Sequence, residues 1–398
     1  MNKDVLLIAH FCSDFDGDGN NRFNFLADLF IKENFDVEFI TSDFSHNKKR
    51  KRKKNDENYD YKITFISEPG YSKNVSFKRF YSHYIMGRNL KKYLKFRKKP
   101  DIVYCAVPSL EVAYIAAIFA NENNIKFVID IQDLWPEAFK MVFHVPILSN
   151  IIFYPMQKKA DYIYSKADKI IAVSQTYSAR ALIVNKKCEK AQSVFLGTEL
   201  AHFDRLAEEN KISDKPKDEI WLAYAGTLGH SYDLTTVIDA LKIIKDIGIM
   251  NIKFIIMGDG PLKQKFEEYA KSKSINALFT GKLGYGEMVG TLTACDIAVN
   301  PISKGSMGSI INKHGDYAAA SLRVINTQEC IEYRDLVDEY QMGLNCENSN
   351  PQDLAEKLII IYKNEHLRRG MAINSRRLAN DKFDRKKTYQ KIVELISG

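Results

Sequence analysis

The stretch GSIINKHGDYAAASLRVINT (308–327) places one lysine and one acid where a polar loop changes into an apolar helix and then a strand. Asn312, Lys313 and Asp316 are spaced so that all three can share one helical face. A surface Lys–Asp pair contributes only about 0.2–0.5 kcal/mol. Ionisable groups beside alanines and a buried strand carry a desolvation cost unless a ligand compensates it. The pattern therefore predicts a ligand site, with Lys313 as a compact charge that meets a phosphate.

Four segments share one geometry, in which a buried strand ends, small residues follow and a helix begins. Backbone N–H groups and the helix dipole attract anions at such a point. The segments are 16–19 (DGDG), 225–234 (AGTLGHSYDL), 257–262 (MGDGPL) and 302–317. The ligand-site candidates in the last three are Gly226, Thr227, Gly229, Ser231, Gly258, Gly308, Ser309, Asn312, Lys313 and Asp316. Glycines needed only for tight turns are the alternative for 225–234 and 257–262.

The first segment, DGDG, matches half of a G-x-G-x-x-G fingerprint, but Arg22 occupies the place of the third glycine. It also lacks the tight spacing after a strand that a dinucleotide site requires. We therefore predict that Gly17, Gly19 and Arg22 belong to a flexible loop at a crevice between two domains.

Strands and helical patterns alternate along the chain, which predicts an α/β protein. Apolar, β-branched runs predict strands at 4–10, 37–42, 62–67, 102–107, 126–131, 169–174 and 193–196, and again at 221–226, 252–258, 277–281, 296–301, 323–327 and 343–346. Such runs indicate parallel sheets covered on both faces. We predict two tandem doubly wound, Rossmann-like domains whose sheets face a central cleft.

The length of 398 residues also favours two domains. We place the first domain at 1–200 and the second at 201–382. The polar segment 197–218 is interpreted as the linker. The amphipathic segment 383–398 either closes the second domain or crosses back to the first.

The composition, with 45% apolar and 27% charged residues, is that of a globular protein. Six scattered cysteines without a C-x-x-C pair argue against a zinc site or a disulfide framework and favour a reducing cytoplasm. We expect no signal peptide, no membrane-spanning segment and no metal or cofactor requirement.

Basic residues are concentrated in one window of the first half. Residues 48–99 hold 18 basic and 4 acidic residues, a net charge of 18 − 4 = +14. The window begins with Lys48, Lys49, Arg50, Lys51, Arg52, Lys53 and Lys54 and ends with NLKKYLKFRKKP (89–100). We interpret it as a surface for an anionic membrane on the cytoplasmic side. A mobile solvated loop at 48–54 is the alternative, and no nucleic-acid-binding signature accompanies the run.

Several motifs together resemble the retaining family 4 glycosyltransferases of the GT-B fold, which build bacterial capsule, exopolysaccharide and O-antigen. They are AGTLG, MGDGP, FTGKLGYGEM, CDIAVNPI and NK…DYAAA…VINT in the second half, with DLWPEAF and ADKIIAVSQ in the first. The resemblance implies an acceptor-binding, membrane-facing domain at 1–200 and a donor-binding domain at 201–382. It also implies a nucleotide diphosphate sugar as donor, with UDP favoured over GDP, and a lipid-linked or polysaccharide acceptor. It implies no metal and no nucleic-acid partner.

The same resemblance assigns individual roles. Asp316 matches the second of the family's two glutamates, which binds the ribose, and the first falls on Gly308. The family's Arg and Lys after strand 221–226 are missing, so Lys313 and the loop amides must hold the diphosphate. Lys282 matches a position beside the nucleobase.

Two further candidates lie in the first half. Asp133 is a candidate contact for the acceptor hydroxyl or a weak base, with a helix N-cap as the alternative. His10, at the end of the first strand, points toward the expected crevice, with a satisfied polar residue at a strand end as the alternative.

We thus expect a hexosyltransferase at the inner face of the cell membrane. A nucleotide-sugar epimerase or hydrolase of the same fold is one rival, and a non-catalytic partner subunit that has lost the first glutamate is the other.

Overall fold

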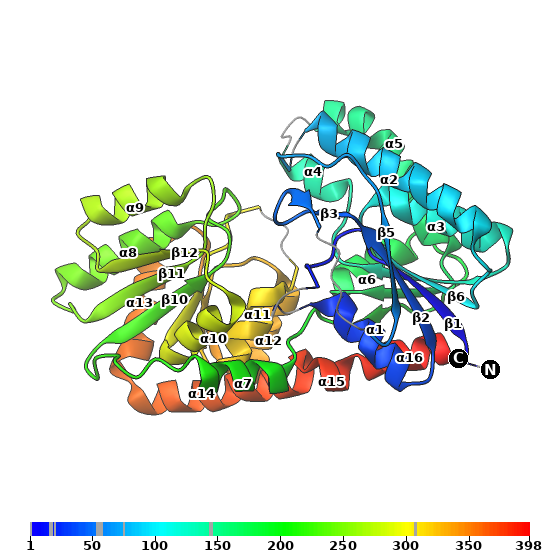
Figure 1. Cartoon of the computed structure of the whole chain (residues 1–398). Helices are drawn as coiled ribbons and strands as arrows, with labels where there is room; N and C mark the ends of the chain where they lie inside the picture. Colours follow the sequence, from blue (N-terminus) through cyan, green and yellow to red (C-terminus); the bar gives the residue numbers. More distant parts are fainter. Residues whose placement is uncertain are drawn as a thin grey trace. The chain divides into compact units, whose positions relative to one another are not determined.

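The computed structural model describes residues 2–15, 19, 21–52, 59–74, 76–142, 146–305 and 309–398. Four predicted site residues lie outside these ranges: Gly17, Lys53, Lys54 and Gly308. The chain forms two compact units, Met1–Val194 together with Tyr389–Gly398, and Phe195–Thr388 (Figure 1).

The first unit is built on a seven-stranded parallel sheet in the order β5-β2-β1-β6-β7-β8-β9. Its strands are β1 (Asp4–Ile8), β2 (Asp36–Ser42), β5 (Lys62–Ile66), β6 (Ile102–Val107), β7 (Lys126–Ile131), β8 (Lys169–Ala172) and β9 (Gln192–Ser193). From β1 the chain adds strands on one side and then, from β6, on the other. The strand order therefore reverses between β1 and β6, where doubly wound domains bind their ligands.

Helices cover both faces of this sheet (Figure 1). The helices are α1 (Arg22–Lys32), α2 (Phe77–Phe96), α3 (Leu110–Glu122), α4 (Glu137–Val142), α5 (Pro146–Lys166), α6 (Gln175–Leu182) and α16 (Gln390–Ser397). Helices α1 and α16 share one core with the sheet through Leu26, Phe30 and Ile392. Helices α2, α3 and α5 pack side by side on the other face.

The second unit repeats this plan with a six-stranded parallel sheet in the order β12-β11-β10-β13-β14-β15. Its strands are β10 (Ile220–Ala225), β11 (Ile252–Met257), β12 (Ala277–Gly281), β13 (Ile297–Asn300), β14 (Arg323–Asn326) and β15 (Gly343–Asn345). Its helices are α7 (Leu200–Glu209), α8 (Leu234–Asp246), α9 (Lys263–Ser272), α10 (Tyr285–Ala294), α11 (Asn312–Ala319), α12 (Ile331–Tyr340), α13 (Pro351–Lys363), α14 (Glu365–Leu378), the π-helix η1 (Ala379–Phe383) and α15 (Arg385–Thr388). Here the order reverses between β10 and β13.

Each predicted strand overlaps an observed parallel strand, and the prediction of two Rossmann-like domains is confirmed. Buried runs such as IVYCAV, with every residue of β6 buried, predict strands well because both faces of the sheet are covered. The structural boundary lies at 194/195, and residues 389–398 belong to the first unit.

The interpretation of 197–218 as a linker was wrong in part. Residues 200–209 form helix α7, because Leu200, Phe203 and Leu206 repeat at helical spacing and are buried in the core of the second unit. A second element was not predicted: the antiparallel pair β3 (Phe44–Ser45) and β4 (Arg50–Lys51), which lies inside the basic run. Over the described ranges, no helix has the length and apolarity that crossing a membrane requires.

Candidate functional site

Two glycine loops meet at the carboxyl end of the second sheet. Gly258 has a φ of +157°, and a Cβ there would lie 1.8 Å from the carbonyl oxygen of Gly226. The amide of Gly226 donates to the carbonyl of Met257 at 2.9 Å, and that of Leu228 donates to Asp259 at 3.0 Å. Gly258 therefore lets the loop after β11 pack against the loop after β10.

The loop after β10 is also tied across the point where the strand order reverses. Tyr232 forms an antiparallel bridge with Ile302, and the amide of Asp233 donates to the carbonyl of Pro301 at 2.8 Å. Asp233 then caps α8 by accepting a hydrogen bond from the amide of Thr236. These bonds hold a rigid loop beside the start of α11.

Lys313, in the first turn of α11, extends into this region. Its Nζ lies 4.3 Å from the ring centre of Tyr224 and 4.0 Å from that of Tyr232. A Cβ on Gly226, whose φ is +151°, would lie 3.1 Å from the same Nζ. The absence of a side chain at 226 thus keeps space next to the ammonium group.

The ammonium of Lys313 is buried without a hydrogen-bond partner among the residues that the structure describes. Burial lowers the pKa of Lys313 well below its usual range. Two tyrosine faces offset part of this cost by cation–π attraction, worth about 0.5–2 kcal/mol each. A buried cation with no counter-charge is a place where an anionic ligand gains the most.

Asp316 lies one turn further along α11 and is held by hydroxyl groups. Its Oδ1 accepts hydrogen bonds from Thr198 and from Tyr285, each at 2.9 Å. Its exposure is 6%. The two predicted partners on α11 are thus brought to one buried region, but Lys313 and Asp316 have different neighbours.

A ladder of buried amides supports the segment before α11. Asn300, Asn326 and Asn345 are in register at the ends of β13, β14 and β15, and each bonds to the next. Asn300 also donates to Gln328, whose amide donates to the carbonyl of Ser309 at 3.2 Å. The ladder fixes the backbone that leads into the helix.

The other predicted ligand-site residues of the second unit differ in their exposure to solvent. Thr227, Ser231, Lys282 and Asn312 are exposed, Gly226 and Gly229 are half-buried, and Ser309 is buried. Gly258 serves the contact between the two loops. The position of the missing first acid, Gly308, lies outside the described residues.

In the first unit, Arg22 differs from its prediction. It is the first residue of α1, not part of a flexible loop, and it is buried. Its Nε and Nη2 donate to the two carboxylate oxygens of Asp130 at 2.9 and 3.1 Å, and its Nη1 donates to Tyr389 at 2.6 Å. Arg22 is therefore a structural cation that joins α1, β7 and the C-terminal segment. Gly19 is exposed.

His10 follows β1 and has partners at both ring nitrogens. Nδ1 lies 2.7 Å from Ser109 Oγ, and Nε2 lies 2.9 Å from Glu68 Oε1. Burial raises the pKa of Glu68, but hydrogen bonds from His10, Ser42 and Ser82 outweigh it and lower this pKa to about 2. The arrangement matches the alternative of a satisfied polar residue at a strand end.

Asp133 lies after β7, next to Trp135. It accepts hydrogen bonds from the amide of Leu134 at 2.9 Å and from Trp135 Nε1 at 3.2 Å, with Tyr177 Oη at 3.5 Å. Burial raises the pKa of Asp133. A carboxylate with a raised pKa at the carboxyl end of a strand has the properties of a weak base.

The basic run 48–54 is not a free charged surface over its described part. Lys48 and Arg52 pair with Asp14, and Lys51 pairs with Asp43. Arg52 keeps only 4% of its side chain exposed. Arg50 is exposed, and Lys49 is half-buried. Three of the five described basic residues of this run are therefore already paired with acids of the protein.

Four site residues were missed in the sequence: Tyr224 and Tyr232 beside Lys313, and Thr198 and Tyr285 beside Asp316. Tyr224 comes two residues before Gly226 in a strand, and Tyr232 occupies a loop, so both read as ordinary core or loop residues. The only available signal was their closeness in sequence to predicted glycines. The described ranges hold no group of three or more His, Cys, Asp and Glu side chains that could bind a metal ion.

Comparison with known proteins identifies the region that contains this site. Residues 207–378 match the family described as "Glycosyl transferases group 1". An uncharacterized glycosyltransferase of Methanocaldococcus jannaschii is 24% identical over 251 residues, which is 59% of this chain and 60% of that protein. The chain thus spans about 60% of the length of the curated relatives it matches.

Solved structures share the whole architecture. Sucrose-phosphate synthase from Thermosynechococcus elongatus superimposes with a TM-score of 0.75 at 14% identity and covers 100% of this chain and 98% of its own. HepE of Anabaena, in complex with UDP-glucose, has a TM-score of 0.68 at 13% identity and covers 100% of both chains. The chain therefore has the GT-B fold, and its residues 207–378 match the group 1 glycosyltransferase family.

Proposed function

We propose that this protein is a glycosyltransferase that moves a hexose from a UDP-sugar to a lipid-linked or polysaccharide acceptor, with retention of the anomeric configuration, in cell-surface polysaccharide synthesis. The observation that carries the proposal is the buried, unpaired ammonium of Lys313 beside the side-chain-free Gly226, inside the group 1 domain. A diphosphate supplies the counter-charge that this site lacks.

In the proposed reaction, the bond between the sugar's anomeric carbon and the diphosphate breaks, and the diphosphate leaves with the electron pair. Lys313 and the N-terminal amides of α11 stabilise the charge that develops on the leaving group. An acceptor hydroxyl forms the new bond on the face that the diphosphate leaves, and its proton passes to the departing phosphate oxygen. Asp316, oriented by Thr198 and Tyr285, is proposed to bind the ribose of the donor.

The donor is proposed to carry uridine because the HepE structure named above, a close match in fold, holds UDP-glucose. Thermal unfolding with UDP, GDP, CMP and NAD tests this assignment. A ligand at 100 times its dissociation constant adds about 2.7 kcal/mol of stability. Stabilisation by UDP that exceeds that by GDP, and is lost in Lys313→Met but kept in the exposed control Lys271→Met, supports the donor site. No stabilisation by any nucleotide contradicts it.

The acceptor is proposed to lie at an anionic membrane, and the surface concerned is the outer face of α2. Its N-terminal half exposes Phe77, Phe80, Tyr81 and Tyr84, with Phe77 94% exposed. Its C-terminal half exposes lysines, and the helix contains no Asp or Glu. Aromatic rings and lysines on one helix face suit the interface of a negatively charged bilayer.

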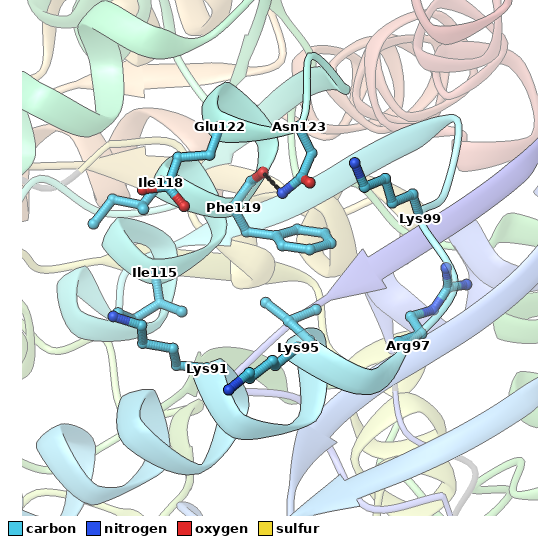
Figure 2. Close-up of a pocket in the computed structure, with 10 residues that line it drawn as sticks. Lys91, Lys95, Arg97, Lys99, Ile115, Ile118, Phe119, Glu122 and Asn123 are labelled. Carbon is cyan, nitrogen blue, oxygen red and sulfur yellow. Dashed lines mark hydrogen bonds between the residues drawn. The ribbon is translucent and has the colours of Figure 1, made fainter.

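A groove of about 330 Å³ lies beside the C-terminal half of α2, between α2 and α3. Figure 2 shows Phe119 and Ile115 in the groove, with the amino groups of Lys91, Lys95 and Lys99 around them. One acid, Glu122, lines it as well. An apolar floor with a basic rim adds to the affinity of this face for anionic lipid.

Vesicle co-sedimentation tests the membrane surface. Replacing Lys91, Lys92 and Lys95 by Gln removes roughly 1 kcal/mol of attraction per lysine, so binding to phosphatidylglycerol vesicles falls roughly 100-fold. Replacing Lys211, Lys265 and Lys271, which are exposed in the second unit, changes the net charge equally and leaves binding unchanged. Equal losses in the two triple variants would mean that net charge, and not the α2 face, governs binding.

A further inference from the structure

A second buried cation without an ion-pair partner among the described residues lies in the first unit. Arg79 of α2 is 9% exposed and is surrounded by aromatic rings. Its guanidinium carbon lies 4.7 Å from the ring centre of Trp135, 5.5 Å from Phe11 and 5.7 Å from Tyr71. One of its nitrogens donates to the carbonyl of Asn74 at 2.8 Å, whereas its Nε has no partner within the described part of the chain.

Lys49 brings another positive charge to the same tyrosine. Its Nζ lies 4.8 Å from the ring centre of Tyr71 and donates to the Asn74 side chain. Neither Lys49 nor Arg79 forms an ion pair with any described residue. Two like charges therefore converge on one aromatic ring.

The nearby acids are already engaged. Glu68 accepts hydrogen bonds from His10, Ser42 and Ser82, and Asp133 accepts from Leu134 and Trp135. A lysine in this position could lose its proton, but a guanidinium cannot. Burial lowers the pKa of Arg79, and Tyr71, Asp133 and Glu68 offset only part of this effect, since neither carboxylate forms an ion pair with the guanidinium. Its Nε, which has no partner among the described residues, is therefore available to an anionic ligand.

The position of the cluster is that of a ligand site. Phe11 follows β1, Tyr71 follows β5, and Trp135 follows β7, so the rings gather at the carboxyl ends of parallel strands. Doubly wound domains bind ligands at this edge. His83 contributes a second buried polar atom without a partner among the described residues, its Nε2, on a ring that stacks on Trp135 at 6.0 Å.

We infer that Arg79 and Lys49 bind an oxyanion of the acceptor, either the phosphate that links a saccharide to lipid or the carboxylate of an acidic sugar. That the anion belongs to an acceptor rests on the proposed function. The anion site itself rests on the guanidinium of Arg79, which has no ion-pair partner among the described residues. The surrounding rings exclude water and strengthen each hydrogen bond to the anion.

The two tryptophans of the chain provide the readout, since Trp135 lies in the cluster and Trp221 lies in the second unit. In protein labelled with 15N-tryptophan, Trp221→Phe assigns the two indole signals. We expect inorganic pyrophosphate or glucuronate to shift the Trp135 signal and leave the Trp221 signal in place. A shift with pyrophosphate but not with glucuronate means that the site binds a phosphate group. A shift with glucuronate but not with pyrophosphate means that it binds the carboxylate of an acidic sugar. An equal shift with neutral glucose, or no shift with either anion, overturns the site.

Matched variants test the residues. Arg79→Gln and Lys49→Gln should each weaken the anion response by roughly ten-fold or more. Arg79→Lys retains the charge and part of the response. The control Arg88→Gln changes an exposed arginine on the same helix and keeps the full response. Unchanged affinity in either folded Gln variant removes that residue from the site. Lys49 is only half-buried, so Lys49→Gln keeps the test available even where Arg79→Gln unfolds.

UDP stabilisation, measured on the same proteins, separates this inference from the proposed function. If the protein binds UDP but the Trp135 signal does not shift with either anion, the anion site is overturned and the donor site stands. A Trp135 response in protein that binds no UDP supports the anion site and removes its assignment to an acceptor.

Discussion

Arg22 in the first unit and Lys313 in the second are both buried cations beside aromatic rings, but their surroundings differ in one respect. Arg22 has a carboxylate partner that it grips with two hydrogen bonds, and it adds a third bond to Tyr389. Lys313 has two tyrosine faces and no hydrogen-bond partner among the described residues. The first site is electrically complete within the protein, and the second is not.

The two residues illustrate two kinds of buried cation, one that stabilises the fold and one that binds a ligand. A paired buried cation belongs to the fold, because removing it leaves its partner's charge uncompensated. An unpaired one lowers the stability of the free protein and is explained by the ligand that completes it. Arg79 belongs to the second class. The free energy of unfolding should distinguish the two kinds of cation, because replacing a paired cation destabilises the protein and replacing an unpaired one stabilises it.

Arg22→Met should have the largest effect. Asp130 would remain buried with Tyr104 and Gln132 as its side-chain donors, so the free energy of unfolding should fall by about 3–5 kcal/mol. Urea denaturation measures the loss. Adding Asp130→Asn should restore part of it, because the stranded charge is gone. A decrease of less than about 1 kcal/mol in the free energy of unfolding of Arg22→Met would mean that the ion pair between Arg22 and Asp130 does not stabilise the fold.

Lys313→Met should have the opposite sign and a smaller size. The folded-state pKa of Lys313 lies below its unfolded value, so between these two pKa values the unfolded chain binds a proton that the folded chain does not. The free energy of unfolding of the wild type therefore rises with pH in that window. Below the window the buried ammonium carries its full cost, and the variant is the more stable protein. Its advantage should shrink as the pH approaches about 10.

Denaturation without nucleotide, from neutral to alkaline pH, checks this prediction. Lys282→Met, at an exposed position, should show the wild-type pH dependence. A wild type that is more stable than Lys313→Met at neutral pH would indicate a hidden counter-charge and end the comparison with Arg22.

Asp316→Asn should change stability least, by about 0.5 kcal/mol or less, because the amide oxygen can still accept from Thr198 and Tyr285. Its affinity for UDP should nevertheless fall roughly ten-fold, since a hydrogen bond to a charged group contributes about 1.5–3 kcal/mol. Calorimetry with UDP measures this, and Asp246→Asn on the surface of α8 is the control. Wild-type affinity in Asp316→Asn would remove this residue from the nucleotide site.

Strands and domains were predictable from the sequence because a parallel sheet covered on both faces imposes continuous apolar runs. Helix α7 was missed because its apolar residues are diluted by charged ones, and only their spacing shows the buried face. The hairpin of β3 and β4 was hidden by the basic run, in which Lys48, Lys51 and Arg52 pair with Asp14 or Asp43. Asp14 lies 38 positions from Arg52, so no local pattern joins these two residues.

The site was predictable at the level of loops and of the Lys313–Asp316 pair, since glycine loops and a lysine at a helix start have local signatures. The partners of each charge were not. Arg22 was assigned to a loop because Asp130 lies 108 positions away, and Arg79 was not singled out because its rings come from three separate segments. Whether a buried charge has an ion-pair partner depends on the fold. The presence of that partner decides whether the charge stabilises the structure or binds a ligand.

Calorimetric titration of the wild type and Lys313→Met with UDP and with uridine would show whether Lys313 binds the diphosphate of the donor. We expect the wild type to prefer UDP to uridine, and Lys313→Met to lose roughly ten-fold or more of the UDP affinity while its affinity for uridine stays the same. Equal UDP affinity in the two proteins would mean that the buried ammonium does not bind the diphosphate.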